Sequence, residues 1–233
     1  QSLSFNHQSQ HNNSSFNPVI GYRRGRILED RRLKSSRRRV AREAAALLYT
    51  SQEKEYKQAK KQAAKTLGIR VLPSNLEVAE ELDRIAEEKE GPSRKELLFQ
   101  MRKEALQIME TLKDFSPKLV GSVWRGTAHQ NSDIDILAFS EDPKAVLNQL
   151  QKNKYTIGSS EWRSVTKRGK KVSSFHIHFI LPSGHEAEVV VRSPEKMGVL
   201  ERCEIYGDVV TGLSQSQLLR VLKEKPLQKF VPT

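Results

Sequence analysis

Two aspartates, Asp133 and Asp135, alternate with isoleucines in the run Ser-Asp-Ile-Asp-Ile. Successive side chains of a strand point to opposite faces, so both carboxylates share one face and the isoleucines take the other. Carboxylates held this close repel each other, and a divalent cation between them relieves the repulsion. Mg²⁺ binds through a few carboxylate oxygens together with substrate phosphates, so it is the metal that we expect here. An isolated Asp-x-Asp is more often an exposed strand end whose aspartates cap the next loop.

A second feature, Gly121-Ser122, follows a short apolar strand predicted at residues 118–120 and precedes Asp133 by about ten residues. The glycine lets the backbone come close to a phosphate, and the serine hydroxyl can donate a hydrogen bond to it. Two strands joined by a short helix or turn would place this phosphate cradle beside the two carboxylates. The combination predicts a site for a metal and a phosphorylated substrate.

These motifs together resemble a known family. Gly121-Ser122, then Arg125-Gly126, then Ser132-Asp-Ile-Asp135 is similar to the signature of nucleotidyltransferases of the DNA polymerase beta superfamily, which includes CCA-adding enzymes, poly(A) polymerases and aminoglycoside nucleotidyltransferases. Residues 120–127 look close to the archaeal CCA-adding enzymes. The resemblance is specific over residues 119–137, extends through the expected sheet to about residue 205 and does not cover the first 115 residues.

The resemblance implies an activity and a set of roles. The expected reaction transfers a nucleoside monophosphate from an NTP to an acceptor hydroxyl with release of pyrophosphate, and it uses two magnesium ions. Asp133 and Asp135 would bind both metals, and Gly121 and Ser122 would hold the terminal phosphates. Arg125 is a further candidate for phosphate binding, although a plain exposed arginine in a turn explains it nearly as well.

The same resemblance implies a third carboxylate on a later strand, which binds the catalytic metal and helps to deprotonate the acceptor. Glu186 and Glu188 are the candidates, and their spacing puts both on the same face of a strand. We favour Glu188 because Ala187 and Val189 flank it. The family often has aspartate at this position, so we expect the glutamate to affect the rate of catalysis more than its existence.

Other residues could do chemistry but have simpler explanations. His176 and His178 share one face of a predicted strand and could bind a transition metal, but no third soft ligand lies nearby in the sequence, which favours a polar outer face. Trp124 and Trp162 could stack on a base, although such aromatic residues more often belong to the core.

The hydrophobic pattern changes from helical to extended after Pro117. Before it, we expect one or two helices within residues 36–67, a C-cap at Gly68, and helices at 75–89 and 94–113 that begin with the capping boxes Ser74/Glu77 and Ser93/Glu96. After it, strands are predicted at 118–120, 134–139, 162–166, 174–181 and 186–192, with a hairpin turn at 169–171 and helices at 142–152 and 214–223.

This pattern indicates an α+β protein with a mixed β-sheet and flanking helices, the nucleotidyltransferase fold, preceded by a helical N-terminal region. The expected divisions are a disordered tail at 1–22, a basic helical region at 23–115, a catalytic domain at 116–205, and a C-terminal helix and tail at 206–233.

The charge is concentrated near the N-terminus. The 233 residues include 40 Lys and Arg against 28 Asp and Glu, a net charge of +12. Ten basic and two acidic residues lie within 22–42, so this segment carries +8. Dense arginine suits bidentate contact with phosphates, so we favour RNA contact over a merely solvated segment. The repeat Lys54, Lys57, Lys61, Lys65 is explained equally well by a solvated face or one that contacts RNA.

Cysteine content and hydropathy indicate the compartment. Cys203 is the sole cysteine, which precludes an intrachain disulfide and fits a reducing cytoplasm. We expect neither a membrane span nor a secretory leader.

Three hypotheses remain open from the sequence. The first is addition of nucleotides to RNA, with a tRNA-like end as one form, and ATP is among the candidate NTPs. The second is modification of a protein or a small molecule, which a short chain suits. The third is a catalytically silent RNA-binding protein, against which the intact Asp133 and Asp135 speak.

Overall fold

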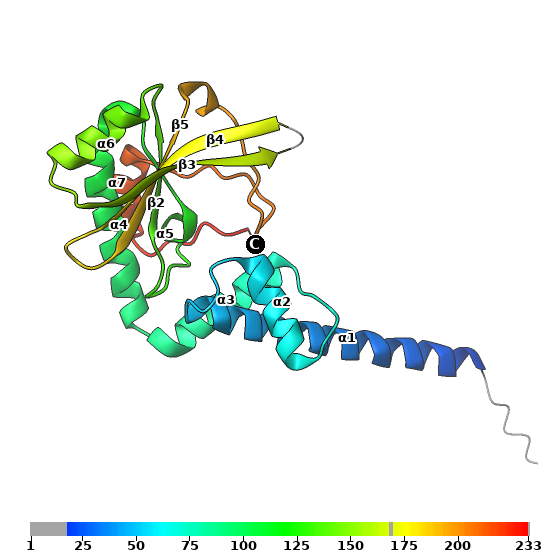
Figure 1. Cartoon of the computed structure of the whole chain (residues 1–233). Helices are drawn as coiled ribbons and strands as arrows, with labels where there is room; N and C mark the ends of the chain where they lie inside the picture. The colour runs from blue at the N-terminus through cyan, green and yellow to red at the C-terminus, as the bar shows by residue number, and fades with distance from the viewer. Residues whose placement is uncertain (1–17, 168–169, 233) are drawn as a thin grey trace, which may run out of the picture.

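The computed structural model describes residues 18–167 and 170–232 (Figure 1). Its N-terminal part consists of three helices, α1 (Pro18–Tyr49), α2 (Tyr56–Leu67) and α3 (Asn75–Glu90). The following elements are α4 (Ser93–Thr111), a 3-10 turn (Lys113–Phe115), β1 (Lys118–Val120), α5 (Gly121–Arg125), β2 (Ile134–Phe139), α6 (Pro143–Lys152), β3 (Ile157–Lys167), β4 (Lys170–Ile180), β5 (Glu186–Arg192), a 3-10 turn (Pro194–Lys196), β6 (Leu213–Ser214) and α7 (Gln215–Glu224).

The strands form one sheet in the order β3-β4-β5-β2-β1-β6. β2 and β5 pair in parallel, whereas all the other neighbours are antiparallel. The mixed sheet and the helical N-terminal region confirm the predicted α+β fold. The turn expected at 169–171 lies partly outside the described residues, but β3 and β4 do pair as a hairpin.

Two hydrophobic cores stabilise the chain. One is formed by α1, α2 and α3 and includes Val40, Ala63 and Val78, which are fully buried. The other lies under one face of the sheet and takes in α4 through Met101, Ile108 and their neighbours, together with residues of α6 and α7. Since α4 packs with the sheet, the border between the cores lies near Gly91 rather than near the expected residue 115.

Local capping signals account for about half of the helix ends. The Ser74/Glu77 capping box begins α3, and Gly68 ends α2 with a left-handed φ of 63°, both as predicted. The Ser93/Glu96 capping box was wrongly predicted, because α4 has Pro92 at its N-cap and the Ser93 hydroxyl donates to the Glu90 carbonyl instead.

Both ends of the chain differ from the predicted tails. Residues 18–22 belong to α1, while residues 1–17 lie outside the described part. After α7 the chain packs back onto the molecule: the Phe230 amide donates to the Arg125 carbonyl, and Arg102 donates to the carbonyls of Pro226 and Gln228. The last residues described therefore help to hold α4 and α5 together. Within the described residues, no helix has the length and apolar character needed to cross a membrane.

Candidate active site

The two faces of the sheet differ in chemistry. Ile134 and Ile136 of β2 are fully buried in the core beneath one face. Asp135 points to the opposite face and pairs in register with Glu188 of β5, and Glu188 pairs in register with His178 of β4. Paired residues on neighbouring strands point to the same side. Side chains from three strands, with Asp133 just before β2, thus meet on one polar face.

Gly121 lies directly against the Asp135 carboxylate. Val120, the last residue of β1, pairs with Asp135, and the chain then turns at Gly121 with a φ of 71°. A Cβ at this position would lie 1.9 Å from Asp135 Oδ2. Both the left-handed backbone and the close approach require glycine. The expected juxtaposition of Gly121-Ser122 and the aspartates is therefore present in the fold.

The pKa values of Asp133 and Asp135 are both raised. Burial, followed by the charges of Asp133 and Glu188, raises the pKa of Asp135 well above its usual range. Asp133 is more exposed, yet desolvation by the surrounding protein and the charges of Glu188 and Glu186 raise its pKa as well. Within the described part of the chain, no lysine or arginine forms an ion pair with either aspartate. Asp133 and Asp135 therefore carry negative charge that no lysine or arginine of the described residues neutralises.

This donor set fits magnesium. Mg²⁺ is a hard cation that takes carboxylate oxygens and keeps room for substrate phosphates, and Asp133, Asp135 and Glu188 supply oxygens on one open face. Carboxylates that are grouped to bind a cation repel one another when only protein charges are present, and this repulsion raises their pKa values.

Glu188 and Glu186 occupy different surroundings. Glu188 is largely buried, and its Oε1 lies 2.7 Å from His176 Nδ1, 3.2 Å from His178 Nε2 and 3.5 Å from Arg163. Glu186 is exposed at the start of β5 and lines the cavity described next. Glu188 pairs in register with Asp135, while Glu186 acts on Asp133 through its charge.

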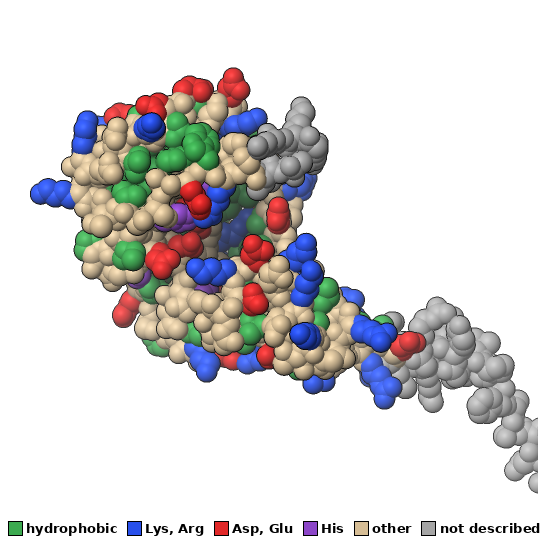
Figure 2. All heavy atoms as spheres, viewed as in Figure 1, with side chains coloured by type: hydrophobic (Ala, Val, Ile, Leu, Met, Phe, Trp, Pro, Cys, Tyr) green, Lys and Arg blue, Asp and Glu red, His purple; other side chains and the backbone are tan. Residues whose placement is uncertain are grey.

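A cavity of about 650 Å³ opens in front of Asp133, Asp135 and Glu186. Its walls come from both parts of the molecule, and Figure 2 shows the corresponding hollow between them. Asp133, Asp135, Gly121 and Ser122 line one side, and the segment between α1 and α2 lines the other. Lys54, an exposed cation of that segment, also lines the cavity. It precedes α2, so it does not belong to the helical lysine stripe considered from the sequence.

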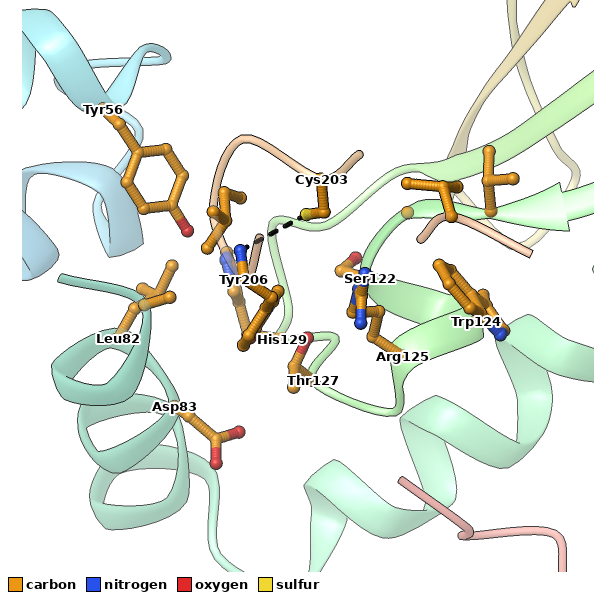
Figure 3. A pocket seen from close by; sticks show the side chains of 15 residues that line it. Tyr56, Leu82, Asp83, Ser122, Trp124, Arg125, Thr127, His129, Cys203 and Tyr206 are labelled. Carbon is orange, nitrogen blue, oxygen red and sulfur yellow. Dashed lines mark hydrogen bonds between the residues drawn. The ribbon is translucent and has the colours of Figure 1, made fainter. Parts of the chain in front are cut away.

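A second, more apolar pocket of about 300 Å³ adjoins Gly121 and Ser122. Figure 3 shows Tyr56 and Leu82 of the helical part facing Ser122, Thr127 and Tyr206 across it. Burial raises the pKa of the Tyr56 hydroxyl, so this group stays neutral and can act as a hydrogen-bond donor. The helical part thus contributes side chains next to the glycine-serine turn, which the sequence did not indicate.

Arg125 is bound within the protein, contrary to the expected phosphate contact. Its guanidinium is buried, donates to both carboxylate oxygens of Asp208 at 2.7 and 2.9 Å and to the Phe230 carbonyl at 2.9 Å, and lies over the rings of Trp124 and Tyr206. These contacts use the fork that a phosphate would need. Arg125 therefore positions α5 and the C-terminal segment.

Of the two tryptophans that could stack on a base or belong to the core, one is buried and one is exposed. Trp124 is buried in the core, as favoured from the sequence. Trp162 is 63% exposed and contacts the edge of Phe175 on β4, so the core assignment is wrong for it. Trp162 lies on β3, the edge strand of the sheet, and pairs with Phe175 of β4, so it has a neighbouring strand on one side only and stays open to solvent.

The loop from Thr127 to Ser132 leads to the aspartates and is fixed by helices. Arg94 of α4 is buried and donates to the carbonyls of Thr127 and Ala128. The Gln130 amide donates to Glu90, and the Asn131 side chain donates to the Tyr49 carbonyl at 2.7 Å. Sequence reasoning missed these residues, since each contact joins distant segments and leaves no local motif.

The basic segment of α1 serves two purposes. Arg37, Arg38 and Arg42 form ion pairs with carboxylates of α3, so part of the charge holds the helical core together. Four other basic residues are exposed and form no ion pair among the described residues: Arg31, Arg32, Lys34 and Arg39. Side chains of residues 18–28 and 30 lie outside what the structure describes.

Comparison with known proteins gives a limited result. Residues 103–193 match a family described as a domain of unknown function (DUF4269). No curated protein matches. The chain is similar to the polymerase core of TRAMP, an RNA surveillance complex, with a TM-score of 0.32 and 17% identity over 49% of this chain and 36% of that one.

Two further solved structures are similar at the same level. One is a GLD-2/RNP-8 complex, with a TM-score of 0.30 and 14% identity over 50% of this chain and 37% of that chain. The other is a cytoplasmic RNA terminal U-transferase, with a TM-score of 0.27 and 16% identity over 51% and 34%. The chain thus spans little more than a third of the length of these proteins. Scores this low carry no conclusion about activity, so the site itself has to support one.

Proposed function

We propose that the protein is a magnesium-dependent nucleotidyltransferase that moves a nucleoside monophosphate from an NTP to an acceptor hydroxyl. The observation that carries this proposal is the meeting of Asp133, Asp135 and Glu188 on one sheet face, with Asp135 and Glu188 in register and the Gly121 backbone against Asp135. The adjoining cavity of about 650 Å³ has room for a nucleotide and an acceptor group.

In this proposal each residue has a defined part. Asp133, Asp135 and Glu188 hold the magnesium ions, and the Gly121 backbone and Ser122 hydroxyl contact the terminal phosphates. Bound magnesium supplies positive charge to the triphosphate and to the attacking and leaving oxygens. The acceptor oxygen forms a bond to the α-phosphorus, the bond to pyrophosphate breaks, and the acceptor proton passes to a carboxylate of the site. Lys54, on the opposite wall, is placed to meet the departing phosphates.

We further propose RNA as the acceptor, with a tRNA-like end as one form. The support is the row of exposed, unpaired basic residues on α1 described above, since such charges bind a polyanion independently of its sequence. A protein or small-molecule acceptor is the alternative, and the cavity enclosed between the two parts of the molecule favours it, because an enclosed cavity suits a small acceptor.

The test is a transfer assay with magnesium, each labelled NTP, and either total RNA or protein as acceptor. Asp133→Asn and Asp135→Asn remove one charge each, and Asp142→Asn is the matched control, since Asp142 is an exposed helix cap outside the cavity. Label in RNA that is lost in the first two variants supports the proposal. Label in protein or a small molecule identifies the alternative acceptor. If the protein binds RNA but transfers no label under any condition, it is a catalytically silent RNA-binding protein.

RNA contact has its own test. Replacing Arg31, Arg32 and Arg39 by glutamine should weaken RNA binding and reduce the slope of log affinity against log salt by up to about 0.9 for each phosphate that is no longer bound. Glutamine at Arg38 and Arg42 is the control, because these residues pair with Glu81 and Glu88 and their replacement should mainly lower helix stability. An unchanged salt slope in the triple variant contradicts the assignment.

A further inference from the structure

A second group of donor atoms lies on the polar face of the sheet, beyond Glu188 toward the β3–β4 hairpin. His176 and His178 of β4 point to this face, and their rings are nearly parallel, with centroids 6.4 Å apart. Among the described residues, His176, His178 and Glu188 are the set in which one ligand atom from each side chain lies within 4.8 Å of the others. The third ligand, which the sequence did not reveal, comes from the neighbouring strand β5.

The contacts within this trio resemble those of a metal site more than those of a surface cluster. His176 Nδ1 and His178 Nε2 both face the same oxygen, Glu188 Oε1, at 2.7 and 3.2 Å. In a tetrahedral site with bonds of about 2.0–2.2 Å, neighbouring ligand atoms lie roughly 3.3–3.5 Å apart. Small side-chain rotations would therefore open room for an ion, and no backbone movement is needed.

The surroundings of His176 support the same interpretation. Its other ring nitrogen, Nε2, lies 2.8 Å from the Ser174 hydroxyl. A metal-binding histidine usually has its second nitrogen fixed by such a hydrogen bond, which orients the ring and selects its tautomer. The side chains of His176 and Glu188 are mostly buried, with 14% and 16% exposure, while His178 is more open at 34%. The site is thus held by the sheet and reachable from solvent.

We propose that His176, His178 and Glu188 bind a divalent transition metal, with Zn²⁺ as the best match. Zinc favours a set of two imidazoles and one carboxylate, whereas magnesium prefers oxygen ligands alone and does not favour the imidazoles. Three protein ligands leave a fourth position open on the polar face. The protein then has two adjacent cation sites of different hardness, joined by Glu188.

Arg163 is the competitor for this site. Its guanidinium lies 3.2 Å from His178 Nε2 and 3.5 Å from Glu188 Oε1, so it supplies positive charge where the metal would lie. Arg163 is about half exposed and also pairs with Glu161 on its own strand. A bound metal would displace the Arg163 guanidinium toward Glu161 and solvent. Replacing Arg163 should therefore strengthen metal binding, which tests the site directly.

The experiment uses tag-free full-length protein stripped of metal and titrated with Co²⁺, a spectroscopic substitute for Zn²⁺. We expect one cobalt ion per chain with a visible absorption band that Zn²⁺ abolishes. His176→Ala and His178→Ala should weaken Co²⁺ binding at least about 100-fold, and Ser174→Ala about 10-fold. Arg163→Gln should strengthen it several-fold. His185→Ala is the matched control, because His185 pairs with Glu104 and lies outside the trio.

Two results overturn the inference. One is the absence of a cobalt band in the wild type and in Arg163→Gln at millimolar Co²⁺. The other is binding that survives His176→Ala and His178→Ala but is lost in Asp135→Asn, because the ion would then lie among the aspartates. Circular dichroism verifies that each variant is folded. Transfer with magnesium, measured in parallel, reports separately on the proposed function: aspartate variants abolish transfer and keep cobalt, whereas histidine variants lose cobalt.

Discussion

Consecutive residues of β2 meet opposite surroundings, because Ile134 and Ile136 are fully buried in the core while Asp135 faces the polar side between them. On the core side, apolar side chains of α4, α6 and α7 cover the sheet completely. On the polar side, Asp133 and Asp135 face a cavity and lack a basic partner among the described residues. One face stabilises the fold, and the other holds charge at the expense of stability.

The largest effect that this comparison predicts belongs to Asp135. Asp135→Asn should lower transfer at least about 1000-fold, since a proposed metal ligand is removed. The same variant should be as stable as the wild type or more so in magnesium-free buffer, because a repelled charge is removed. Transfer rates and urea unfolding verify the pair of expectations. If Asp135→Asn lost activity because it unfolded, the polar face would also be needed for stability, which would contradict the separate roles of the two faces.

A neighbouring residue on the other face should behave in the opposite way. Ile136→Ala leaves a cavity in the core and should lower the free energy of unfolding by about 3 kcal/mol, while transfer per folded molecule changes little. Leu137→Ala, a half-buried residue on the polar side, is the control and should cost clearly less. Equal losses of stability in the two variants would show that both faces are packed alike.

A third prediction concerns Arg125, which was expected at the substrate and lies inside the protein. Arg125→Lys keeps the charge but loses the two-pronged contact with Asp208, so the free energy of unfolding should fall by about 2 kcal/mol. Arg42→Lys alters a similar but exposed pair with Glu88 and should change stability by no more than about 0.5 kcal/mol. An Arg125→Lys protein of normal stability with a raised KM for NTP would restore the phosphate role.

The smallest expected effect is a pH dependence. The pKa of Asp135 is raised in the fold, so between its unfolded and folded values the native state binds more protons than the unfolded state, and this residue's cost falls as pH falls. Wild type and Asp135→Asn should therefore differ on the order of 1 kcal/mol or more at neutral pH and converge only as pH falls to about 4, the unfolded value of an aspartate.

Comparing the two proteins at each pH is necessary because His129 acts in the other direction. Burial lowers the pKa of His129, so folding loses stability as pH falls through the unfolded value of a histidine. That contribution is present in both proteins and cancels in their difference. In saturating magnesium, the free energy of unfolding of the wild type should rise relative to that of Asp135→Asn as pH rises, because the metal competes with protons for Asp135. A difference that does not vary with pH would contradict the electrostatic interpretation.

The sequence predicted what depends on local pattern. Alternation placed Asp133 and Asp135 on one side of β2, capping residues marked the ends of α2 and α3, and glycine next to a strand located the turn at Gly121. Each of these inferences uses residues within a few positions of one another. The choice of Glu188 over Glu186 used its apolar neighbours Ala187 and Val189, since alternation puts both glutamates on the same face; in the fold Glu188 pairs in register with Asp135.

What the sequence could not predict depends on which distant segments become neighbours. The pairing of β4 with β5 brings Glu188 to His176 and His178, and nothing in the spacing of these residues reveals it. Arg125 was a candidate for phosphate binding because it lies in the motif that resembles the family, and its local sequence does not reveal that Asp208 and the C-terminal segment enclose it. The placement of α4 in the sheet core likewise follows from packing, since a helix pattern does not say which neighbour buries it.

The anchoring of residues 226–230 by Arg102 and Arg125 has a consequence for the order of synthesis. Arg102 is fully buried and donates to four backbone carbonyls, two at the end of α5 and two in this last segment. A nascent chain that has already formed β2 and β5 still leaves these guanidinium donors partly unsatisfied, which is costly in a buried position. The glycine-serine turn therefore becomes fully fixed only after residues about a hundred positions later have been synthesised. A fragment that ends before them would contain every proposed ligand but would lack the hydrogen bonds that hold α5 in place.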